Sequence, residues 1–260
     1  MLNNIIKNNK ENIPYNLTCS SRTTFLYPKN YNELKTILAY LKKNNEKVLI
    51  KTGSCGHGDK SNLNGYEFAI SLSKLNKIIK FNKAKKTIIA QAGIGLNELF
   101  FYLKEKGYII FNIPGGRTVS LGGGIAGNVH GRPVKKNYEN FGDNIISLKV
   151  MFDNGKIKQI TKKNKIFYEI IGGLGLFTII LEAKLKVHKI ENNFCDKITT
   201  TISDIKEFEK YQKNLKRFYG YINHFNKKNF EGSFINFVAK KNIKKENVYK
   251  FKKYLLLNFL

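Results

Sequence analysis

The 260-residue sequence is poor in cysteine and has no long apolar run. Its cysteines are Cys19, Cys55 and Cys195, an odd number at unrelated spacings, so they indicate neither a disulfide framework nor a zinc site. No stretch reaches the roughly 18 apolar residues of a membrane-spanning helix, and the start of the chain lacks the apolar core of a signal peptide. We therefore expect a cytoplasmic protein without a membrane crossing or a bound metal.

Arginine is also scarce, although the formal net charge is +27. The positive charge is almost all lysine, which reads base edges poorly because it lacks the planar fork of the guanidinium group. The lysines are scattered among asparagine, isoleucine, phenylalanine and tyrosine, a pattern typical of a solvated surface, so we expect no specific nucleic-acid partner. Lysines clustered at positions 227–245 leave open a peripheral contact with an anionic membrane at its inner face, or with a phosphate-bearing substrate.

Several catalytic signatures are absent as well. The sequence has no Walker lysine motif and no Rossmann G-x-G-x-x-G in its strand-to-helix setting. No carboxylate pair, Ser/His/Asp order or metal-spaced histidine cluster stands out. These absences leave the glycine-rich segments as the main carriers of function.

The apolar patterning predicts an α+β protein with helices between short strands. Residues 31–45 are apolar at helical spacing, and Asn30 and Glu33 are placed for a capping box. Asp153-Asn154-Gly155 is a turn that closes a hairpin. The other predicted helices are 96–106, 164–171 and 203–218, and the predicted strands are 48–50, 68–72, 78–81, 87–92, 145–152, 156–161 and 177–187.

Glycine is concentrated in three loops, at residues 53–59, 114–131 and 172–176. Glycine weakens regular structure by roughly 0.5–1 kcal/mol per position relative to alanine, so such runs need a compensating use. The usual use is close approach of backbone N–H groups to a phosphate or a flat ring. The loops therefore predict a site for a large phosphate-bearing cofactor.

The same loops resemble those of a known family. The motifs are GSCGHGD at 53–59, PGGRTVSLGGGIAGNVHG at 114–131 and GGLGLFTIILEAKLKV at 172–187, after an opening around Tyr27-Pro28. They are similar to the FAD-binding (PCMH-type) oxidoreductases of the vanillyl-alcohol oxidase superfamily, and within it to the decaprenylphosphoryl-ribose 2′-oxidases and sugar-lactone oxidases. The resemblance covers residues 23–187 and implies a two-subdomain FAD-binding domain of the α+β kind.

The resemblance also implies roles for individual residues. Backbone groups of residues 53–58 and 115–123 would hold the FAD pyrophosphate, with Ser120 capping the short helix that follows. His130 is expected beside the flavin as the catalytic residue, and Arg132 beside a substrate phosphate. Noncovalent FAD is favoured, with linkage through His57 or Cys55 as the alternative. The implied cofactor-binding residues are Gly53, Ser54, Cys55, Gly56, His57, Gly58, Asp59, Pro114, Gly115, Gly116, Ser120, Gly122, Gly123, Gly127, Asn128, Gly131 and Gly175.

The composition changes near residue 190, where glycine thins out and charge rises. We therefore expect a polar leader at 1–22, an FAD-binding domain at 23–190, and at 191–260 the start of an α+β substrate domain that is incomplete. Family members continue beyond this point, so the resemblance implies a fragment, a truncated protein or one half of a split enzyme.

The function implied is oxidation of a secondary alcohol of a sugar, sugar lactone or polyprenyl-phosphate sugar by hydride transfer to flavin. Its partners would be a sugar-type small molecule and an electron acceptor. A second hypothesis is a flavin-binding half-protein that is inactive without a separate C-terminal partner. A basic binder of nucleic acid or membrane surfaces is a third, and it predicts steeply salt-dependent binding without any flavin colour.

Overall fold

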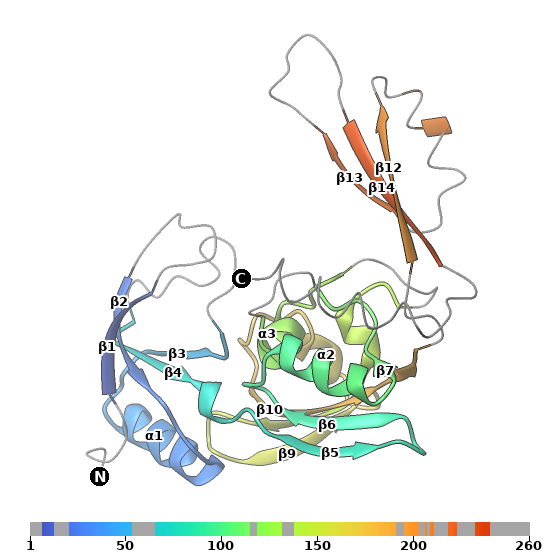
Figure 1. Cartoon of the computed structure of the whole chain (residues 1–260). Coiled ribbons are helices and arrows are strands. Elements are labelled where there is room, and N and C mark those ends of the chain that lie inside the picture. Colours follow the sequence, from blue (N-terminus) through green and yellow to red (C-terminus); the bar gives the residue numbers. More distant parts are fainter. Residues whose placement is uncertain are drawn as a thin grey trace. The chain divides into compact units, whose positions relative to one another are not determined.

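The chain divides into two compact units, Met1–Lys189 and Ile190–Leu260. They are seen in a computed structural model (Figure 1), which describes residues 7–12, 21–53, 66–114, 119–131, 138–190, 195–202, 206, 209–210, 218–222 and 232–239. The first unit contains two larger sheets with their helices and one two-stranded sheet. This arrangement confirms the α+β class.

The first sheet has the strand order β1-β2-β4-β3. Strands β2, β3 and β4 run parallel, and β1 is antiparallel to β2. The polar leader predicted at 1–22 therefore includes a strand, which the period-2 pattern could not reveal because β1 is polar throughout. The strands are β1 (Lys7–Asn12), β2 (Ser21–Leu26), β3 (Val48–Lys51) and β4 (Phe68–Ser71).

Helix α1 (Tyr31–Lys43) connects β2 to β3 and buries Leu34, Ile37 and Leu41. Its predicted N-terminus is confirmed. Asn30 Oδ1 accepts the N–H of Glu33 at 2.9 Å, and the Asn30 amide donates to the Glu33 carboxylate at 2.8 Å. The cap satisfies one of the donors that a helix start leaves without a partner inside the helix.

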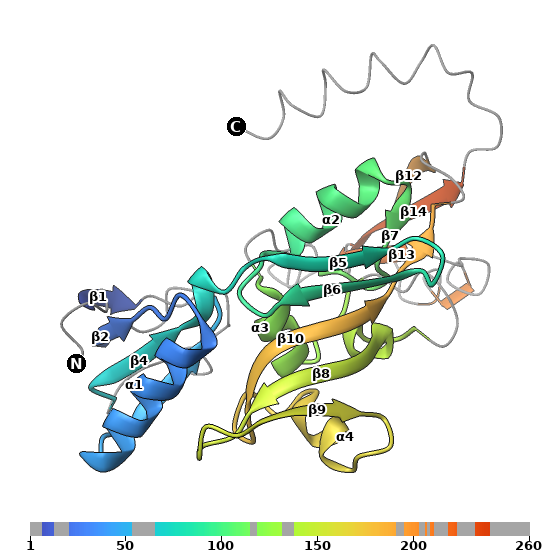
Figure 2. The same ribbon diagram turned by 90° about the horizontal axis from the view of Figure 1, so that it is seen from below.

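The second sheet is antiparallel, with the order β5-β6-β10-β8-β9 that Figure 2 shows across the sheet. Helices α2 and α3 lie on one of its faces (Figure 1). The strands are β5 (Ile78–Asn82), β6 (Thr87–Gln91), β8 (Ile145–Met151), β9 (Ile157–Thr161) and β10 (Ile179–Lys186). The helices are α2 (Leu96–Glu105), α3 (Leu121–Ala126) and α4 (Ile166–Ile170).

Short elements complete the first unit. Strand β7 (Tyr108–Ile109) pairs with β11 (His188–Lys189). The short 3-10 helix η2 (Leu72–Lys74) follows β4, and the 3-10 helix η3 (Phe141–Asn144) precedes β8. One hydrophobic core joins α1 to both sheets. Burial of this shared core is what holds the two sheets of the unit together.

The second unit contains a three-stranded antiparallel sheet of order β12-β14-β13. Its strands are β12 (Cys195–Ile202), β13 (Phe218–Ile222) and β14 (Gly232–Ala239). The helix predicted at 203–218 lies almost entirely outside the described residues, and all the lysines of the 227–245 cluster lie outside them. The substrate-domain assignment stays a prediction.

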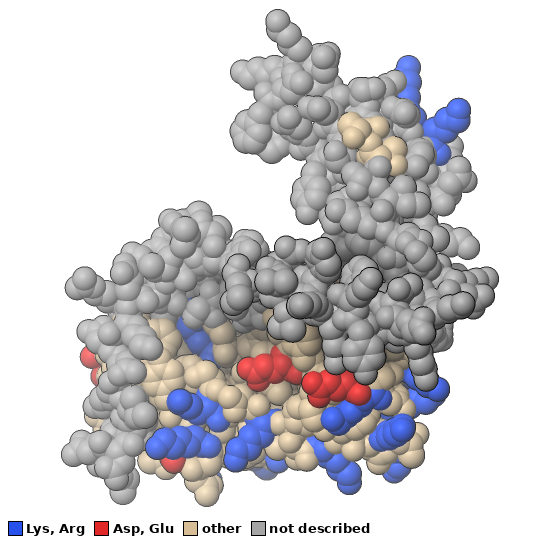
Figure 3. All heavy atoms as spheres, in the orientation of Figure 1, with Lys and Arg blue, Asp and Glu red and all other residues tan. Residues whose placement is uncertain are grey.

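Surface properties agree with the reading of the lysines as solvated. On the face drawn in Figure 3, the described Lys side chains are spread over the surface, with acidic and other residues between groups of them, and they do not form one patch. Within the described ranges, no helix combines the length and apolar character needed to span a membrane. The same part of the chain holds no group of three or more His, Cys, Asp or Glu side chains that could bind a metal.

A polar cluster links α1 to the second sheet. Tyr31 donates its hydroxyl to Glu182 Oε1 at 2.7 Å and accepts from Gln91 Nε2 at 3.1 Å. Glu182 also pairs with Lys149 at 3.0 Å. Burial of the Tyr31 hydroxyl, together with its bond to the Glu182 carboxylate, raises the pKa of Tyr31 above its ordinary value.

The raised pKa predicts a loss of stability in alkali. Neutral Tyr31 makes its full contribution to the free energy of unfolding below about pH 10, the ordinary tyrosine pKa. The contribution is lost as the pH rises above that value, because the folded state holds the Tyr31 proton more tightly than the unfolded state does. Between about pH 10 and 12, the unfolding free energy of the wild type should fall more steeply than that of Tyr31→Phe, by up to about 1.4 kcal/mol per pH unit. The difference is smaller to the extent that solvent screens the Tyr31 hydroxyl. Urea unfolding at a series of pH values measures this.

Tyr40 provides the matched control, because it lies on the same helix and is exposed. Tyr40→Phe should follow the wild-type pH profile. Identical profiles for Tyr31→Phe and the wild type would contradict the predicted role of the cluster.

Candidate cofactor site

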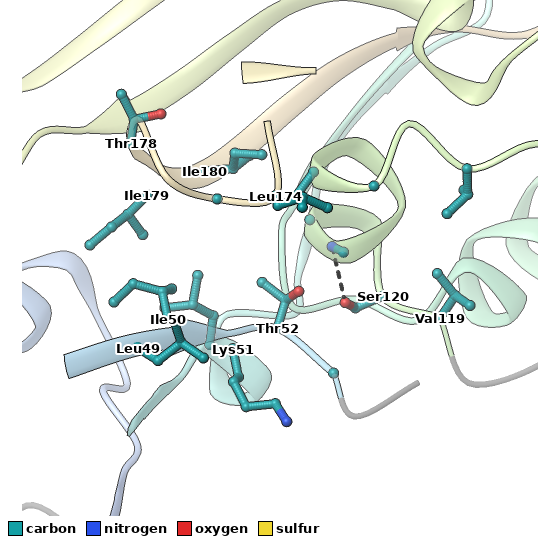
Figure 4. A pocket seen from close by; sticks show the side chains of 18 residues that line it. Leu49, Ile50, Lys51, Thr52, Val119, Ser120, Leu174, Thr178, Ile179 and Ile180 are labelled. Carbon is teal, nitrogen blue, oxygen red and sulfur yellow. Dashed lines mark hydrogen bonds between the residues drawn. The ribbon is translucent and has the colours of Figure 1, made fainter. Parts of the chain in front are cut away.

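A cavity of about 310 Å³ lies between the first sheet and the α3 side of the second sheet. Figure 4 shows its lining side chains, which come from β3, from α3 and the residues at both of its ends, and from the loop and strand start of β10. Its walls are mostly apolar, and a few polar groups are set among them. The lining residues are Leu49, Ile50, Lys51, Thr52, Gly53, Leu72, Val119, Ser120, Gly122, Gly123, Ala126, Gly127, Val129, Leu174, Gly175, Thr178, Ile179 and Ile180.

Helix α3 is fixed in this wall by its backbone. Leu96 N–H donates to Val119 O at 2.8 Å, Leu121 N–H to Ile94 O at 2.8 Å, and Gly122 N–H to Ala92 O at 2.7 Å. The chain entering α3 therefore pairs with the chain leaving β6 as two strands would. This pairing determines where the glycine-rich helix lies.

Gly122 is required at the closest point of this contact. A Cβ there would lie 2.8 Å from Thr52 Cγ2 and 2.9 Å from Ala92 Cβ, so a side chain has no room. The Gly122 N–H donates to Ala92 O and is therefore not available to a phosphate, while the predicted contact of Gly122 with the cofactor stays a prediction. Gly122 serves the site by close packing.

The N-terminus of α3 brings polar groups to the cavity. Ser120 is the N-cap, as predicted, and its Oγ accepts the Gly123 N–H at a long 3.3 Å. A Cβ on Gly123 would lie 3.1 Å from Ser120 Oγ and 3.3 Å from Thr52 Oγ1, so both hydroxyl groups border the same point (Figure 4). The first three N–H groups of α3 are used inside the protein, by Ile94 O, Ala92 O and Ser120 Oγ, so the two hydroxyl groups are what this end offers to a ligand.

The third glycine loop is attached to the other end of α3. Gly172 N–H donates to Ile125 O at 3.0 Å, and Leu174 N–H donates to Ala126 O at 2.9 Å. These bonds satisfy carbonyl groups that the helix end leaves unpaired. Helix α3 thus holds the loop that precedes β10 against the cavity.

An orphaned polar atom supports a ligand in this place. Thr178 is 7% exposed and lines the cavity, and its Oγ1 has no hydrogen-bond partner. A buried hydroxyl without a partner costs about 1–3 kcal/mol, a cost that a bound polar group removes. Apolar walls with a few hydroxyl groups and close-packed glycines fit a dinucleotide cofactor, which presents flat rings and phosphates together.

The structure brings together glycines from all three predicted loops. Six of the predicted cofactor-binding residues line the cavity: Gly53, Ser120, Gly122, Gly123, Gly127 and Gly175. Pro114, Asn128, His130 and Gly131 are described but do not line it. The remaining predicted residues lie outside the described residues, and they are Ser54, Cys55, Gly56, His57, Gly58, Asp59, Gly115, Gly116 and Arg132.

Two of the predicted residues that do not line the cavity, Asn128 and Gly131, stabilise the local structure. Asn128 adopts a left-handed φ of 39°, and its Oδ1 accepts the Gly142 N–H at 3.1 Å. Gly131 passes so close to Ile113 that a Cβ would lie 2.2 Å from the Ile113 carbonyl oxygen. His130 between them is exposed, and its catalytic role stays a prediction.

Several cavity residues were missed by the sequence reasoning. Thr52, Leu174 and Thr178 were not singled out, although each lies within three positions of a predicted glycine. The apolar lining residues were interpreted only as core. Their proximity to the glycine loops was the available signal, because a residue beside a ligand-contacting backbone usually contacts the ligand as well.

The fold and the cavity define a module that binds a nucleotide-type cofactor. The model of the FAD binding domain family matches residues 23–161, which is more than half of the chain. The chain belongs to the FAD binding domain family, and its cofactor is FAD. The resemblance inferred from the glycine motifs is thereby confirmed, while the choice between covalent and noncovalent FAD stays a prediction.

Curated relatives match between about half and two thirds of the chain. Decaprenylphosphoryl-beta-D-ribose oxidase from Mycolicibacterium smegmatis is 28% identical over 53% of this chain and 30% of its own length. L-gulonolactone oxidase from Mus musculus is 24% identical over 65% of this chain and 39% of its own. D-lactate dehydrogenase [cytochrome] 1 from Saccharomyces cerevisiae is 29% identical over 63% and 29%. The chain thus spans well under half the length of these relatives.

A solved structure shares the fold. Cholesterol oxidase from Brevibacterium sterolicum superposes with a TM-score of 0.75 at 15% identity, over 92% of this chain and 49% of the other. At this identity the match shows the fold alone. The agreement covers more of the chain than any of these sequence matches.

The packing of α3 predicts different outcomes for two neighbouring glycines. Gly122→Ala should lower the free energy of unfolding by about 1–3 kcal/mol, because its Cβ overlaps Thr52 and Ala92 within a close-packed wall. Urea unfolding of the purified variant measures this.

Gly123→Ala is the control from the same helix. Its Cβ meets only the hydroxyl ends of Ser120 and Thr52, and alanine gains about 0.5–1 kcal/mol of helix propensity over glycine. Its loss of stability should be clearly smaller. Equal losses in both variants would refute the close-packing role of Gly122.

Proposed function

We propose that the protein is an FAD-dependent oxidoreductase that oxidises a secondary alcohol of a sugar, a sugar lactone or a polyprenyl-phosphate sugar. The observation that carries the proposal is the meeting of three glycine loops at one cavity in a chain of the FAD binding domain family. The oxidase names of the relatives from Mycolicibacterium smegmatis and Mus musculus support the sugar-type substrate.

In this proposal, the residues of the chain bind FAD and orient it in the cavity. FAD, when bound, supplies the hydride acceptor. Ser120 and Thr52 offer hydroxyl groups at the α3 end of the cavity, which can hydrogen-bond polar groups of FAD. Leu49, Ile50 and Ile180 form apolar walls that exclude water from a ring system. We propose that this binding is noncovalent, and that His130 acts on the substrate side of the flavin.

A second candidate is a flavin-binding half-protein that needs a separate C-terminal partner for activity. The observation that favours it is coverage: the chain spans 30% of the ribose oxidase and 39% of the gulonolactone oxidase. Such a half-protein binds FAD in the same cavity but does not transfer hydride from an alcohol. Reduction by substrate separates the two candidates.

Anaerobic reduction tests the oxidoreductase proposal. The purified full chain is loaded with FAD and mixed with L-gulonolactone or a ribose-type alcohol, while the visible flavin absorption is followed. We expect bleaching by at least one sugar-type alcohol and none with free FAD under the same conditions. Bound FAD that no such alcohol bleaches would contradict the proposal and favour the half-protein.

Thr178 gives a prediction about cofactor affinity. Rotation about χ1 exchanges its hydroxyl and methyl positions, so the unpaired hydroxyl can turn toward a bound polar group. Thr178→Val should weaken FAD binding by about 0.5–1.5 kcal/mol. The FAD-free variant should be at least as stable as the wild type, because a buried unpaired hydroxyl is removed. Fluorescence titration with FAD and thermal unfolding measure the two effects.

Thr178→Ser retains the hydroxyl and should bind FAD more tightly than Thr178→Val. If the serine and valine variants bound FAD equally, steric change and not the hydroxyl would account for any loss.

A further inference from the structure

Leu174 combines a strained backbone with an exposed apolar side chain at the cavity. Its φ is 52°, in the left-handed region that side-chain-bearing residues other than Asn and Asp rarely occupy. Gly172 and Gly175 on either side also have positive φ, at 86° and 82°, but glycine adopts this region at no steric cost. A glycine at position 174 would therefore suit the loop better.

The surrounding hydrogen bonds hold Leu174 in this conformation. Its N–H donates to Ala126 O at 2.9 Å, and the N–H of Gly172 donates to Ile125 O at 3.0 Å. Both acceptors belong to the last turn of α3, which is itself fixed to the chain after β6. The conformation follows from the docking of the loop onto a rigid element.

The Leu174 side chain is little buried by the rest of the protein, so its packing offsets little of the free-energy cost of the left-handed backbone. Leu174 lines the cavity, yet it is 55% exposed. Leu176, two positions on, is 79% exposed and does not line the cavity. Strained backbone conformations are found most often at ligand sites, where contacts with the bound molecule offset the free-energy cost of the strain. An exposed leucine that faces a cofactor cavity from a strained position fits this pattern.

We propose that the side chain of Leu174 packs against a flat ring of bound FAD and positions it in the cavity. The loop rigidity places the leucine at the ring, and the ring covers apolar surface that is otherwise exposed to water. The proposal rests on FAD binding by this chain. Either the adenine or the isoalloxazine offers such a ring, so the test separates the two ends of the cofactor.

The test compares Leu174→Ala, Leu174→Gly and Leu176→Ala in the full chain. Fluorescence titration gives the dissociation constant of FAD, and thermal unfolding without FAD gives the stability. Leu174→Ala should weaken FAD binding about tenfold, since it removes much of the apolar contact of a leucine. Leu174→Gly should weaken it as much while raising Tm of the FAD-free protein, because glycine tolerates positive φ.

Leu176→Ala is the matched control, since it removes the same side chain from the same loop away from the cavity. It should bind FAD like the wild type. Titrations with ADP and with FMN identify the ring: a loss of affinity for ADP alone assigns Leu174 to the adenine, and a loss for FMN alone assigns it to the isoalloxazine.

Wild-type affinity for FAD in both Leu174 variants would overturn the proposal while leaving FAD binding intact. An equal loss in Leu176→Ala would overturn it as well, because the effect would then belong to the loop and not to Leu174. A wild-type chain that binds no FAD at all would overturn both the proposal and the cofactor assignment.

Discussion

The site depends on the backbone pairing that docks the short helix α3 onto the chain after β6. The N–H groups of Leu121 and Gly122 donate to Ile94 and Ala92, and the N–H of Leu96 donates to Val119 in return. Main-chain hydrogen bonds buried in this way are costly to leave unmade. The pairing therefore holds a six-residue helix that would not be stable alone.

Helix α3 positions two further parts of the cavity. Its first residues bring Ser120 and Gly123 beside Thr52, at the end of the first sheet. Its last turn carries the loop of Gly172 and Leu174. A helix rich in glycine can approach both neighbours closely, and this explains why glycine occurs there despite its low helix propensity. The same glycines that weaken the helix allow the site to form.

The sequence allowed prediction of most elements of the first unit, because helical and alternating apolar spacing report which side chains are buried. It also indicated that the glycine loops meet, and Gly53, Gly123 and Gly175 do line one cavity. It could not show that the Gly122 amide is used inside the protein, since hydrogen-bond partners depend on tertiary contacts. Nor could it reveal β1, whose polar residues form a strand only by pairing with β2.

The most direct test of the account is the visible spectrum of the purified chain after saturation with FAD and removal of the excess, followed by acid precipitation. The account predicts one flavin per chain, released into the supernatant by acid. A chain that remains colourless after exposure to FAD would contradict the assignment of the cavity as a cofactor site.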